Sequence, residues 1–306
     1  MLGRRSDPHW LRSPHPVLEP DRPLDDLKVL CPWVVPLAGG YRLFYMGHGN
    51  LSPPGTTGRI LSAWSDDGVT FRKEPGVRID NDVHASARAL SPCVIPCSAG
   101  GFRMYFEAAR AANGEGAVIL SAYSEDGLTF AREPGVRVTS AGARVGSPRA
   151  LLLDDGRIRL YFHRYPEPVA ERLDRGNHVL SGLSLDGLSI AIEPGVRLAQ
   201  TEPCERAAVY CASMVRLGGL HVRAYYGAWS GDADALGAVM SALSEDDGLT
   251  FVKDRAPCIA PDGPLDASFA SEPCVYRDRA GRLRMVYEGS DAAGITRILT
   301  AVSTHP

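Results

Sequence analysis

Hydrophobic and polar positions follow a pattern along the chain that recurs about every 60 residues. Each repeat begins with an apolar run, and the five runs are Val29–Val35, Ala89–Ile95, Val145–Leu151, Val209–Val215 and Ala270–Tyr276. After a turn comes a stretch such as Phe102–Phe106, in which arginine is interleaved with aromatic or aliphatic residues. Alternation of this kind is typical of a strand with two unlike faces. Each repeat is therefore predicted to start with two antiparallel strands.

The second half of each repeat is a third apolar stretch followed by a Ser-x-Asp-Gly turn and a short fourth strand. The serines that mark this position lie 59 or 60 residues apart, at Ser65, Ser124, Ser184, Ser244 and Ser303. Self-similarity at a fixed period predicts a repeat architecture. An aspartate that caps its own backbone explains the turn, so we interpret the turn as architectural. The Glu-Pro-Gly-Val-Arg segments that follow it are interpreted in the same way.

Four antiparallel strands repeated five times predict an all-β fold, a five-bladed β-propeller that forms a single domain. A closed ring buries both faces of every blade. The repeats fall at about residues 19–78, 79–137, 138–197, 198–258 and 259–306. The last repeat lacks a fourth strand, and the segment Trp10–Leu18 matches Phe130–Val138. Residues 1–18 are therefore predicted to complete the last blade and close the ring.

The composition agrees with this fold and argues against several classes of partner. The 306 residues include 32 glycines and 23 prolines, which is more turn-forming sequence than a helical protein tolerates. A formal charge of −3 gives no basic excess, so a nucleic-acid partner is not expected. The sequence has neither an 18-residue apolar run nor a signal-like start, so we expect no membrane association and a cytoplasmic location. Seven cysteines without metal-site spacing predict reduced thiols and no metal or cofactor.

Candidate chemistry gathers where the ring axis is expected to open, at the starts of the first strands and the ends of the second strands. The equivalent second-strand positions are Met46, Glu107, His163, Gly227 and Glu288. A repeat kept for packing alone would hold the same residue in each copy. The variety therefore indicates a pocket for an asymmetric ligand, although solvated strand ends are the alternative.

Two sets of residues are nominated for this pocket. The acid–base candidates, chosen because carboxyl and imidazole groups exchange protons with substrates, are Glu272, Asp26, Glu107, His163 and His84. The substrate-binding candidates are Arg88, Arg144, Arg149, Arg206, Tyr210, Trp229, Asp266, Glu288, Ser91 and Ser147. The four arginines suit a carboxylate or phosphate on an anionic small-molecule substrate. The alternative is that they form salt bridges with acids of the protein.

The repeats, the turns and a proline dipeptide in four of the first strands resemble the superfamily of arabinanases, xylosidases, invertases and levansucrases, the five-bladed glycosidases. The dipeptides are Cys31-Pro32, Ser91-Pro92, Ser147-Pro148 and Glu272-Pro273. The resemblance implies three axial carboxylates, one from each of the first three blades. This sequence has Cys31, Ser91 and Ser147 there, whereas glycoside hydrolysis normally uses two carboxyl groups. Glu272 occupies the before-proline position of the fifth blade and is the candidate general acid.

Three functions fit these observations. The first is a glycoside hydrolase-like enzyme that acts on a small sugar-containing or polar metabolite through non-standard acid–base residues. The second is a biosynthetic tailoring enzyme, such as a cyclase, isomerase or lyase, and the third is a non-catalytic ligand-binding propeller. Two acids on one cavity with an aromatic platform such as Trp33 or Trp229 would favour the first. A single acid with a histidine in an apolar pocket would favour the second, and a flat axial face the third.

Overall fold

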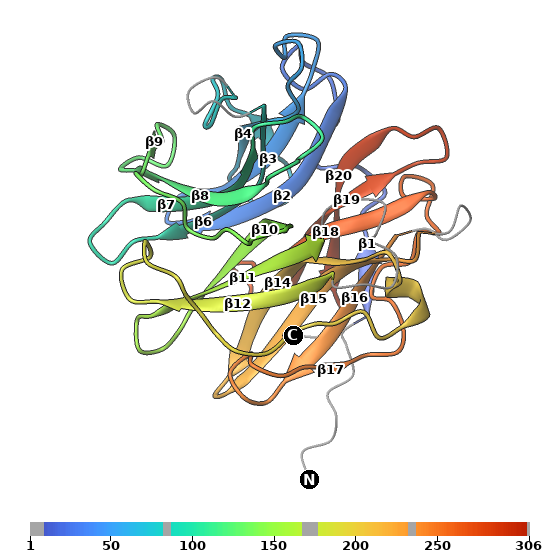
Figure 1. Ribbon diagram of the computed structural model, residues 1–306. Coiled ribbons are helices and arrows are strands. Elements are labelled where there is room, and N and C mark those ends of the chain that lie inside the picture. The colour runs from blue at the N-terminus through green and yellow to red at the C-terminus, as the bar shows by residue number, and fades with distance from the viewer. Residues whose placement is uncertain (1–8, 82–86, 167–176, 232–236, 305–306) are drawn as a thin grey trace.

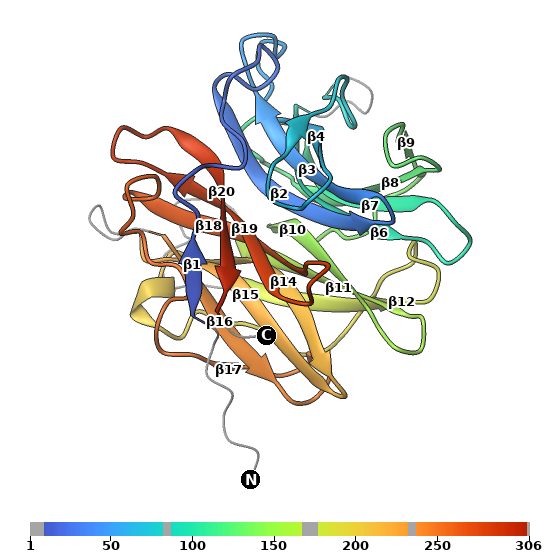
Figure 2. The same cartoon turned by 180° about the vertical axis from the view of Figure 1, so that it is seen from behind.

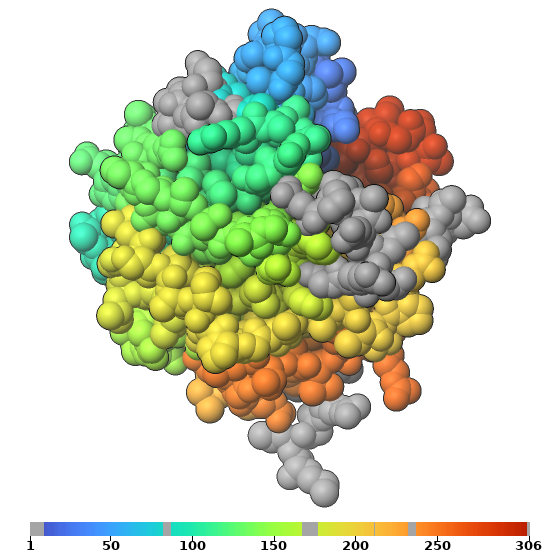
Figure 3. Space-filling view, in the orientation of Figure 1, coloured from blue at the N-terminus to red at the C-terminus, as the bar shows by residue number. Residues whose placement is uncertain are grey.

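The computed structural model describes residues 9–81, 87–166, 177–231 and 237–304 (Figure 1). These residues form five four-stranded antiparallel sheets, and the sheets stand around a common axis as the blades of a propeller. In the space-filling view the colours follow one another around the ring in chain order (Figure 3). The prediction of an all-β, five-bladed propeller is confirmed.

Within each blade the strands run from the axis outward. Blade 1 contains β2 (Lys28–Leu37), β3 (Gly40–His48), β4 (Arg59–Ser65) and β5 (Arg72–Lys73). Blade 2 contains β6 (Arg88–Pro96), β7 (Phe102–Ala109), β8 (Val118–Ser124) and β9 (Ala131–Arg132). Blade 3 contains β10 (Ala143–Leu152), β11 (Ile158–Pro166), β12 (His178–Ser184) and β13 (Ala191–Ile192).

Blade 4 contains β14 (Ala208–Gly218), β15 (His221–Trp229), β16 (Ala238–Ser244) and β17 (Val252–Lys253). Blade 5 contains β18 (Phe269–Arg277), β19 (Leu283–Ser290), β20 (Thr296–Ser303) and, at its outer edge, β1 (Trp10–Arg12). A short 3-10 helix, η2 (Pro203–Glu205), precedes β14. Within the described ranges no helix has the length and apolar character needed to cross a lipid bilayer.

The ring is closed by β1, which pairs with the last strand of the chain (Figure 2). Trp10 lies opposite Ser303, and Arg12 lies opposite Ala301. The Trp10 ring also meets Tyr225 of blade 4 edge-on, with 5.6 Å between the ring centroids. The predicted completion of the last blade by the N-terminal segment is confirmed.

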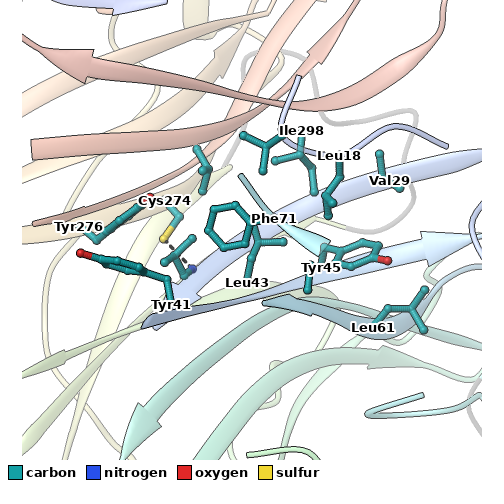
Figure 4. Packing of buried hydrophobic residues seen from close by; sticks show 14 residues of the cluster. Leu18, Val29, Tyr41, Leu43, Tyr45, Leu61, Phe71, Cys274, Tyr276 and Ile298 are labelled. Atoms are coloured by element: carbon teal, nitrogen blue, oxygen red, sulfur yellow. Dashed lines mark hydrogen bonds between the residues drawn. The ribbon is translucent and has the colours of Figure 1, made fainter. Parts of the chain in front are cut away.

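The hydrophobic core lies largely between neighbouring blades. Between blades 1 and 5, Leu43 and Tyr41 pack in one cluster with Cys274 and Tyr276 (Figure 4). The backbone N–H of Val34 donates to Cys274 Sγ across the same interface, at 3.3 Å. The buried cysteine therefore behaves as a packing residue that also accepts one hydrogen bond.

The Ser-x-Asp-Gly turn is a local capping structure. In blade 2, Asp126 Oδ1 accepts hydrogen bonds from the backbone N–H groups of Leu128 and Thr129 and from the Ser124 hydroxyl, each at 2.8 Å. These donors stabilise the charged carboxylate, so the pKa of Asp126 is held well below its ordinary value. The aspartate therefore has a structural role in the turn, as the sequence indicated.

The repeated Glu-Pro-Gly-Val-Arg segment joins each of the first three blades to the next. In blade 2, Glu133 binds Arg103 of β7 at 2.8 Å, and Arg103 also donates to the carbonyl of Asp186 in the blade 3 turn, at 2.8 Å. Arg137 donates to Leu188 O of the same turn at 2.8 Å. At the junction of blades 1 and 2, Arg42 and Arg78 donate to backbone carbonyls of the blade 2 turn. At the junction of blades 3 and 4, Arg159 and Arg197 donate to backbone carbonyls of the blade 4 turn. The motif is therefore an inter-blade staple.

Candidate functional site

Each innermost strand has a β-bulge at the equivalent place, near the N-terminal end of the strand. In four blades the residue before proline has a left-handed backbone, with φ of 53° at Cys31, 52° at Ser91, 46° at Ser147 and 49° at Glu272. Such angles are costly for residues other than glycine and are concentrated at functional sites. A bulge also redirects side chains. Here Ser91 Oγ lies 3.4 Å from Ser147 Oγ and 3.5 Å from Cys31 Sγ, so the bulged residues of adjacent blades meet near the axis.

The second strand of each blade contributes one residue to a second ring, next to the ring of bulged residues. The residues paired with the last regular position before each bulge are Met46, Glu107, His163, Gly227 and Glu288. The structural equivalence of these five positions, which the sequence predicted, is confirmed. The two rings together place polar side chains from several blades around one opening.

A cavity of about 780 Å³ occupies this opening. Its lining residues are Arg88, Leu90, Ser91, Glu107, Ser147, His163, Tyr165, Asn177, Ala207, Ala208, Tyr210, Trp229, Gly231, Phe269 and Glu272. These residues belong to blades 2 to 5 and the loops between them. On the side of blade 1, Cys31 and Met46 pack against Leu90 in a small apolar cluster. The first-blade position that carries a carboxylate in the resembling glycosidases is therefore packed away from the cavity.

Glu107 is a lining residue with almost no solvent exposure, at 1%. Arg88 Nε lies 3.1 Å from Glu107 Oε1, and the backbone N–H of Ser147 donates to the same carboxyl group. Burial raises the pKa of Glu107, and the positive charge of Arg88 opposes that shift only in part. A Cβ at position 146 would overlap Glu107 Oε2, so Gly146 provides the space that the carboxyl group occupies.

Glu272 enters the cavity from blade 5, and its side chain is 12% exposed. Arg149 Nη2 lies 3.4 Å from Glu272 Oε2. Arg149 is fully buried, donates through Nη1 to the carbonyls of Ser91 (3.4 Å) and Pro148 (2.8 Å), and lies over the Trp33 ring at 5.4 Å. One guanidinium group of blade 3 therefore contacts blades 1, 2 and 5 and holds Glu272 in place.

Glu288 and Cys31 lie behind Glu272. One ligand atom from each of these three side chains falls within 4.8 Å of the others. Burial, and then the charge of Glu272, raises the pKa of both Glu288 and Cys31. Each of the three groups therefore disfavours a negative charge on its neighbours.

Aromatic residues form a further part of the cavity wall. The His163 ring stacks on Tyr165 with 4.7 Å between centroids and meets Tyr210 edge-on at 6.4 Å. The Ser271 hydroxyl donates to the Tyr210 hydroxyl at 2.6 Å. Trp229, 42% exposed, and Phe269 continue this wall.

The cavity unites eight of the residues nominated from sequence, namely Arg88, Ser91, Glu107, Ser147, His163, Tyr210, Trp229 and Glu272. Arg149 and Glu288 lie directly behind Glu272, as described above. Arg144 donates to the Asn113 carbonyl at 2.8 Å and lies over the Tyr165 ring at 5.7 Å. Arg206 follows η2 and is not a lining residue, and His84 lies outside the described residues.

Two nominated acids belong to loops instead of the cavity, and the expectation that they face it is corrected. Asp26 accepts hydrogen bonds from the backbone N–H and the side-chain amide of Asn50, both at 2.8 Å. Asp266 is buried, accepts from the Tyr287 hydroxyl at 2.8 Å and lies 3.4 Å from Arg12. Both residues precede the first strands, outside the bulges that turn side chains toward the axis.

Seven lining residues were missed from the sequence: Leu90, Tyr165, Asn177, Ala207, Ala208, Gly231 and Phe269. Tyr165 lies two positions after His163 on the same strand, and such residues share one face, so alternation could have identified it. Asn177 had no such signal. Its Oδ1 is buried and has no hydrogen-bond partner among the described residues, so a ligand donor would satisfy it.

A curated protein matches part of this sequence. No family model matches the sequence. The uncharacterized protein MT1551 of Mycobacterium tuberculosis (strain CDC 1551 / Oshkosh) is 36% identical over 111 residues, which are 35% of this chain and 34% of that protein. This chain therefore aligns with about one third of its curated relative.

Solved structures match over nearly the whole chain. One glycoside hydrolase has a TM-score of 0.77 at 15% identity, covering 97% of this chain and 93% of its own. A thermostable family-43 glycoside hydrolase has a TM-score of 0.69 at 16% identity, with 89% and 88% coverage. The endo-arabinase of Bacteroides thetaiotaomicron VPI-5482 has a TM-score of 0.68 at 15% identity, with 93% and 96% coverage. This chain has the five-bladed propeller fold of these glycoside hydrolases.

Proposed function

We propose that the protein is a glycoside hydrolase-like enzyme that acts on a small, neutral sugar-containing metabolite in the axial cavity. The observation that carries the proposal is the presence of two carboxyl groups, Glu107 and Glu272, in unlike environments on one cavity. Unlike environments let two carboxyl groups take different roles in one reaction. Glycoside hydrolysis needs one carboxyl group that holds a proton and one that is charged.

Glu107 suits the role of general acid. Its burial raises its pKa, so it keeps its proton at a pH where an exposed glutamate is ionised. Glu272 suits the role of the charged carboxylate, because Arg149 lies 3.4 Å away and stabilises a negative charge. We therefore assign to Glu107 the acid role that the sequence suggested for Glu272.

In this mechanism the Glu107 proton passes to the glycosidic oxygen, which takes the electron pair of the breaking C–O bond. The Glu272 carboxylate either attacks the anomeric carbon or removes a proton from the attacking water. In the first course the sugar is held as an ester of Glu272, and water activated by Glu107, now the base, releases it with retained configuration. The second course inverts the configuration. The anomer that first appears in an NMR time course distinguishes the two.

The charges around the cavity support a neutral substrate. Arg88 lies against Glu107, and Arg149 lies against Glu272. Arg149 is thus matched by the charged Glu272 carboxylate, as the salt-bridge alternative expects, whereas Arg88 contacts the carboxyl group that holds the proton in this mechanism.

The cavity also bears on the other functions. A tailoring enzyme was expected to present one acid with a histidine, whereas here two carboxyl groups line the cavity together with His163 and aromatic residues. A binding propeller was expected to present a flat face, whereas this face has a cavity of about 780 Å³. Both observations favour the glycosidase-like reading.

Hydrolysis assays with matched variants test the proposal. Wild type is assayed on 4-nitrophenyl, 2,4-dinitrophenyl and methyl glycosides of several neutral sugars, alongside Glu107→Gln, Glu272→Gln and the exposed control Glu125→Gln. Loss of a general acid costs roughly 10²–10⁴-fold, so Glu107→Gln should lose that much on methyl glycosides. It should lose far less on dinitrophenyl glycosides, whose leaving group needs no proton.

Glu272→Gln should lose activity on every substrate, and Glu125→Gln should match wild type. The proposal is wrong if wild type hydrolyses none of these glycosides. It is also wrong if Glu107→Gln and Glu272→Gln both keep full turnover.

A further inference from the structure

Three aromatic lining residues, Tyr210, Trp229 and Phe269, come from blades 4 and 5. The charged side chains Arg88, Glu107 and Glu272 come from blades 2 and 5. Blade 4 and its flanking loops contribute Ala207, Ala208, Tyr210, Trp229 and Gly231. We call Tyr210, Trp229 and Phe269 the aromatic side of the described cavity. Phe269 lies on the same strand as Glu272, so this side adjoins that carboxyl group.

The rings of the aromatic side are held in fixed positions. The Tyr210 hydroxyl is engaged by Ser271 at 2.6 Å. A Cβ at position 227 would approach Tyr210 Cζ to 2.9 Å, and a Cβ at position 237 would overlap the ring of Phe269. Glycines at 227 and 237 therefore make room for these two rings beside the cavity. A rigid aromatic surface binds planar groups at a low cost in conformational entropy.

Trp229 extends this surface to the mouth of the cavity. It is the last residue of β15, pairs with Ala208 and is 42% exposed. Ala207 and Ala208, which also line the cavity, have only small side chains. The cavity volume of about 780 Å³ lies within the range of sites that bind drug-sized ligands. A sugar at Glu107 and Glu272 therefore leaves room for a second group.

We propose that the substrate is a glycoside with a planar, apolar aglycone, and that the aglycone binds against Tyr210, Trp229 and Phe269. The position of the sugar rests on the proposed function. The aglycone subsite rests on the aromatic side of the cavity. Aromatic faces also stack on sugar rings, so the test includes a disaccharide as a competing occupant.

Binding assays test the subsite separately from catalysis. Affinities are measured by calorimetry for phenyl and methyl glycosides of arabinofuranose, xylose and glucose, and for the corresponding methyl disaccharides. Wild type and Glu107→Gln are both used, because the second should bind without turnover. We expect at least one sugar whose phenyl glycoside binds ten or more times tighter than its methyl glycoside, and tighter than the disaccharide.

The variant Trp229→Ala should lower that preference below threefold while the affinity for the methyl glycoside stays the same. Trp229→Phe should restore most of it. Trp64→Ala is the matched control, since Trp64 lies over Arg42 at the outer part of blade 1 and should leave the preference unchanged.

The subsite is refuted by equal affinities for phenyl and methyl glycosides, by tighter binding of the disaccharide, by no detectable phenyl glycoside binding, or by an unchanged preference in Trp229→Ala. Failure of the proposed function gives a different result. In that case no glycoside is hydrolysed, but the phenyl preference and its dependence on Trp229 persist.

Discussion

Arg149 of blade 3 and Glu272 of blade 5 form an ion pair of 3.4 Å, although blade 4 separates their blades in the ring. The contact therefore passes across the propeller axis. Arg149 also reaches blades 1 and 2 through Trp33 and the Ser91 carbonyl. The same guanidinium group therefore links several blades and positions a carboxyl group on the cavity.

Replacing Arg149 alone should destabilise the protein strongly. Arg149→Met keeps the volume of the side chain but leaves a buried carboxylate without its counter-charge, which costs about 3–5 kcal/mol. Urea unfolding monitored by tryptophan fluorescence measures this loss. The double variant Arg149→Met/Glu272→Gln should recover part of the stability, because no uncompensated charge remains. A double variant less stable than Arg149→Met would contradict the role given to the pair.

The stability of the protein should depend on pH through Glu107. Its pKa in the folded protein is raised above 4.5, so the folded state binds the proton more tightly than the unfolded state does. The contribution of this group is therefore most favourable below pH 4.5 and is lost as the pH rises through the raised pKa. Glu107→Gln should lack this decline, whereas Glu125→Gln should follow wild type. Parallel curves of unfolding free energy against pH for wild type and Glu107→Gln would disprove the burial argument.

The position of the Glu107 carboxyl group should depend on Gly146. An alanine there would overlap Glu107 Oε2 and push the carboxyl group away from Arg88 and the Ser147 N–H. A displacement of about 1 Å at a reacting group costs roughly 100-fold in rate, so kcat of Gly146→Ala should fall by about that factor. In the control Gly39→Ala the new Cβ makes only ordinary contact with Trp64, and kcat should not change. An unaltered kcat and pH profile in Gly146→Ala would show that the carboxyl position is unimportant.

The inter-blade staple should contribute to stability and not to the cavity. Arg103→Met removes the contacts to Glu133 and to the Asp186 carbonyl. A hydrogen bond to a charged group is worth about 1.5–3 kcal/mol, so the unfolding free energy should fall by about 2 kcal/mol with ligand affinity unchanged. Arg157→Met, which removes the exposed pair with Asp155, is the control and should leave the denaturation midpoint in place. Equal effects of the two variants would rule out the staple.

Much of the architecture could be predicted because its signals are local. The turn serines, the Asp-Gly turns and the alternation of the second strands define each blade within one repeat. The match between Trp10–Leu18 and Phe130–Val138 located the strand that closes the ring, and the pairing of Trp10 with Ser303 confirms it. The alignment of repeats also identified Glu107, His163 and Glu288 as equivalent positions, because a fixed register makes equivalent residues neighbours around the axis.

The candidate site was predicted less completely because its contacts join residues far apart in the chain. Asp26 and Glu107 are both acids near strand ends, but one caps a loop through Asn50 and the other is buried on the cavity. No local pattern separates them, since the difference lies in which blade packs against each. The same holds for Cys31 and Met46, which close the side of blade 1.

The sequence by itself determined the number of blades, their strand order and the closure of the ring, because these follow from short-range periodicity and turn chemistry. The tertiary structure decided which side chains share the cavity and which carboxyl groups have a raised pKa. Those properties depend on the left-handed bulges that aim the side chains, on burial between blades, and on Arg149 reaching Glu272 across the axis.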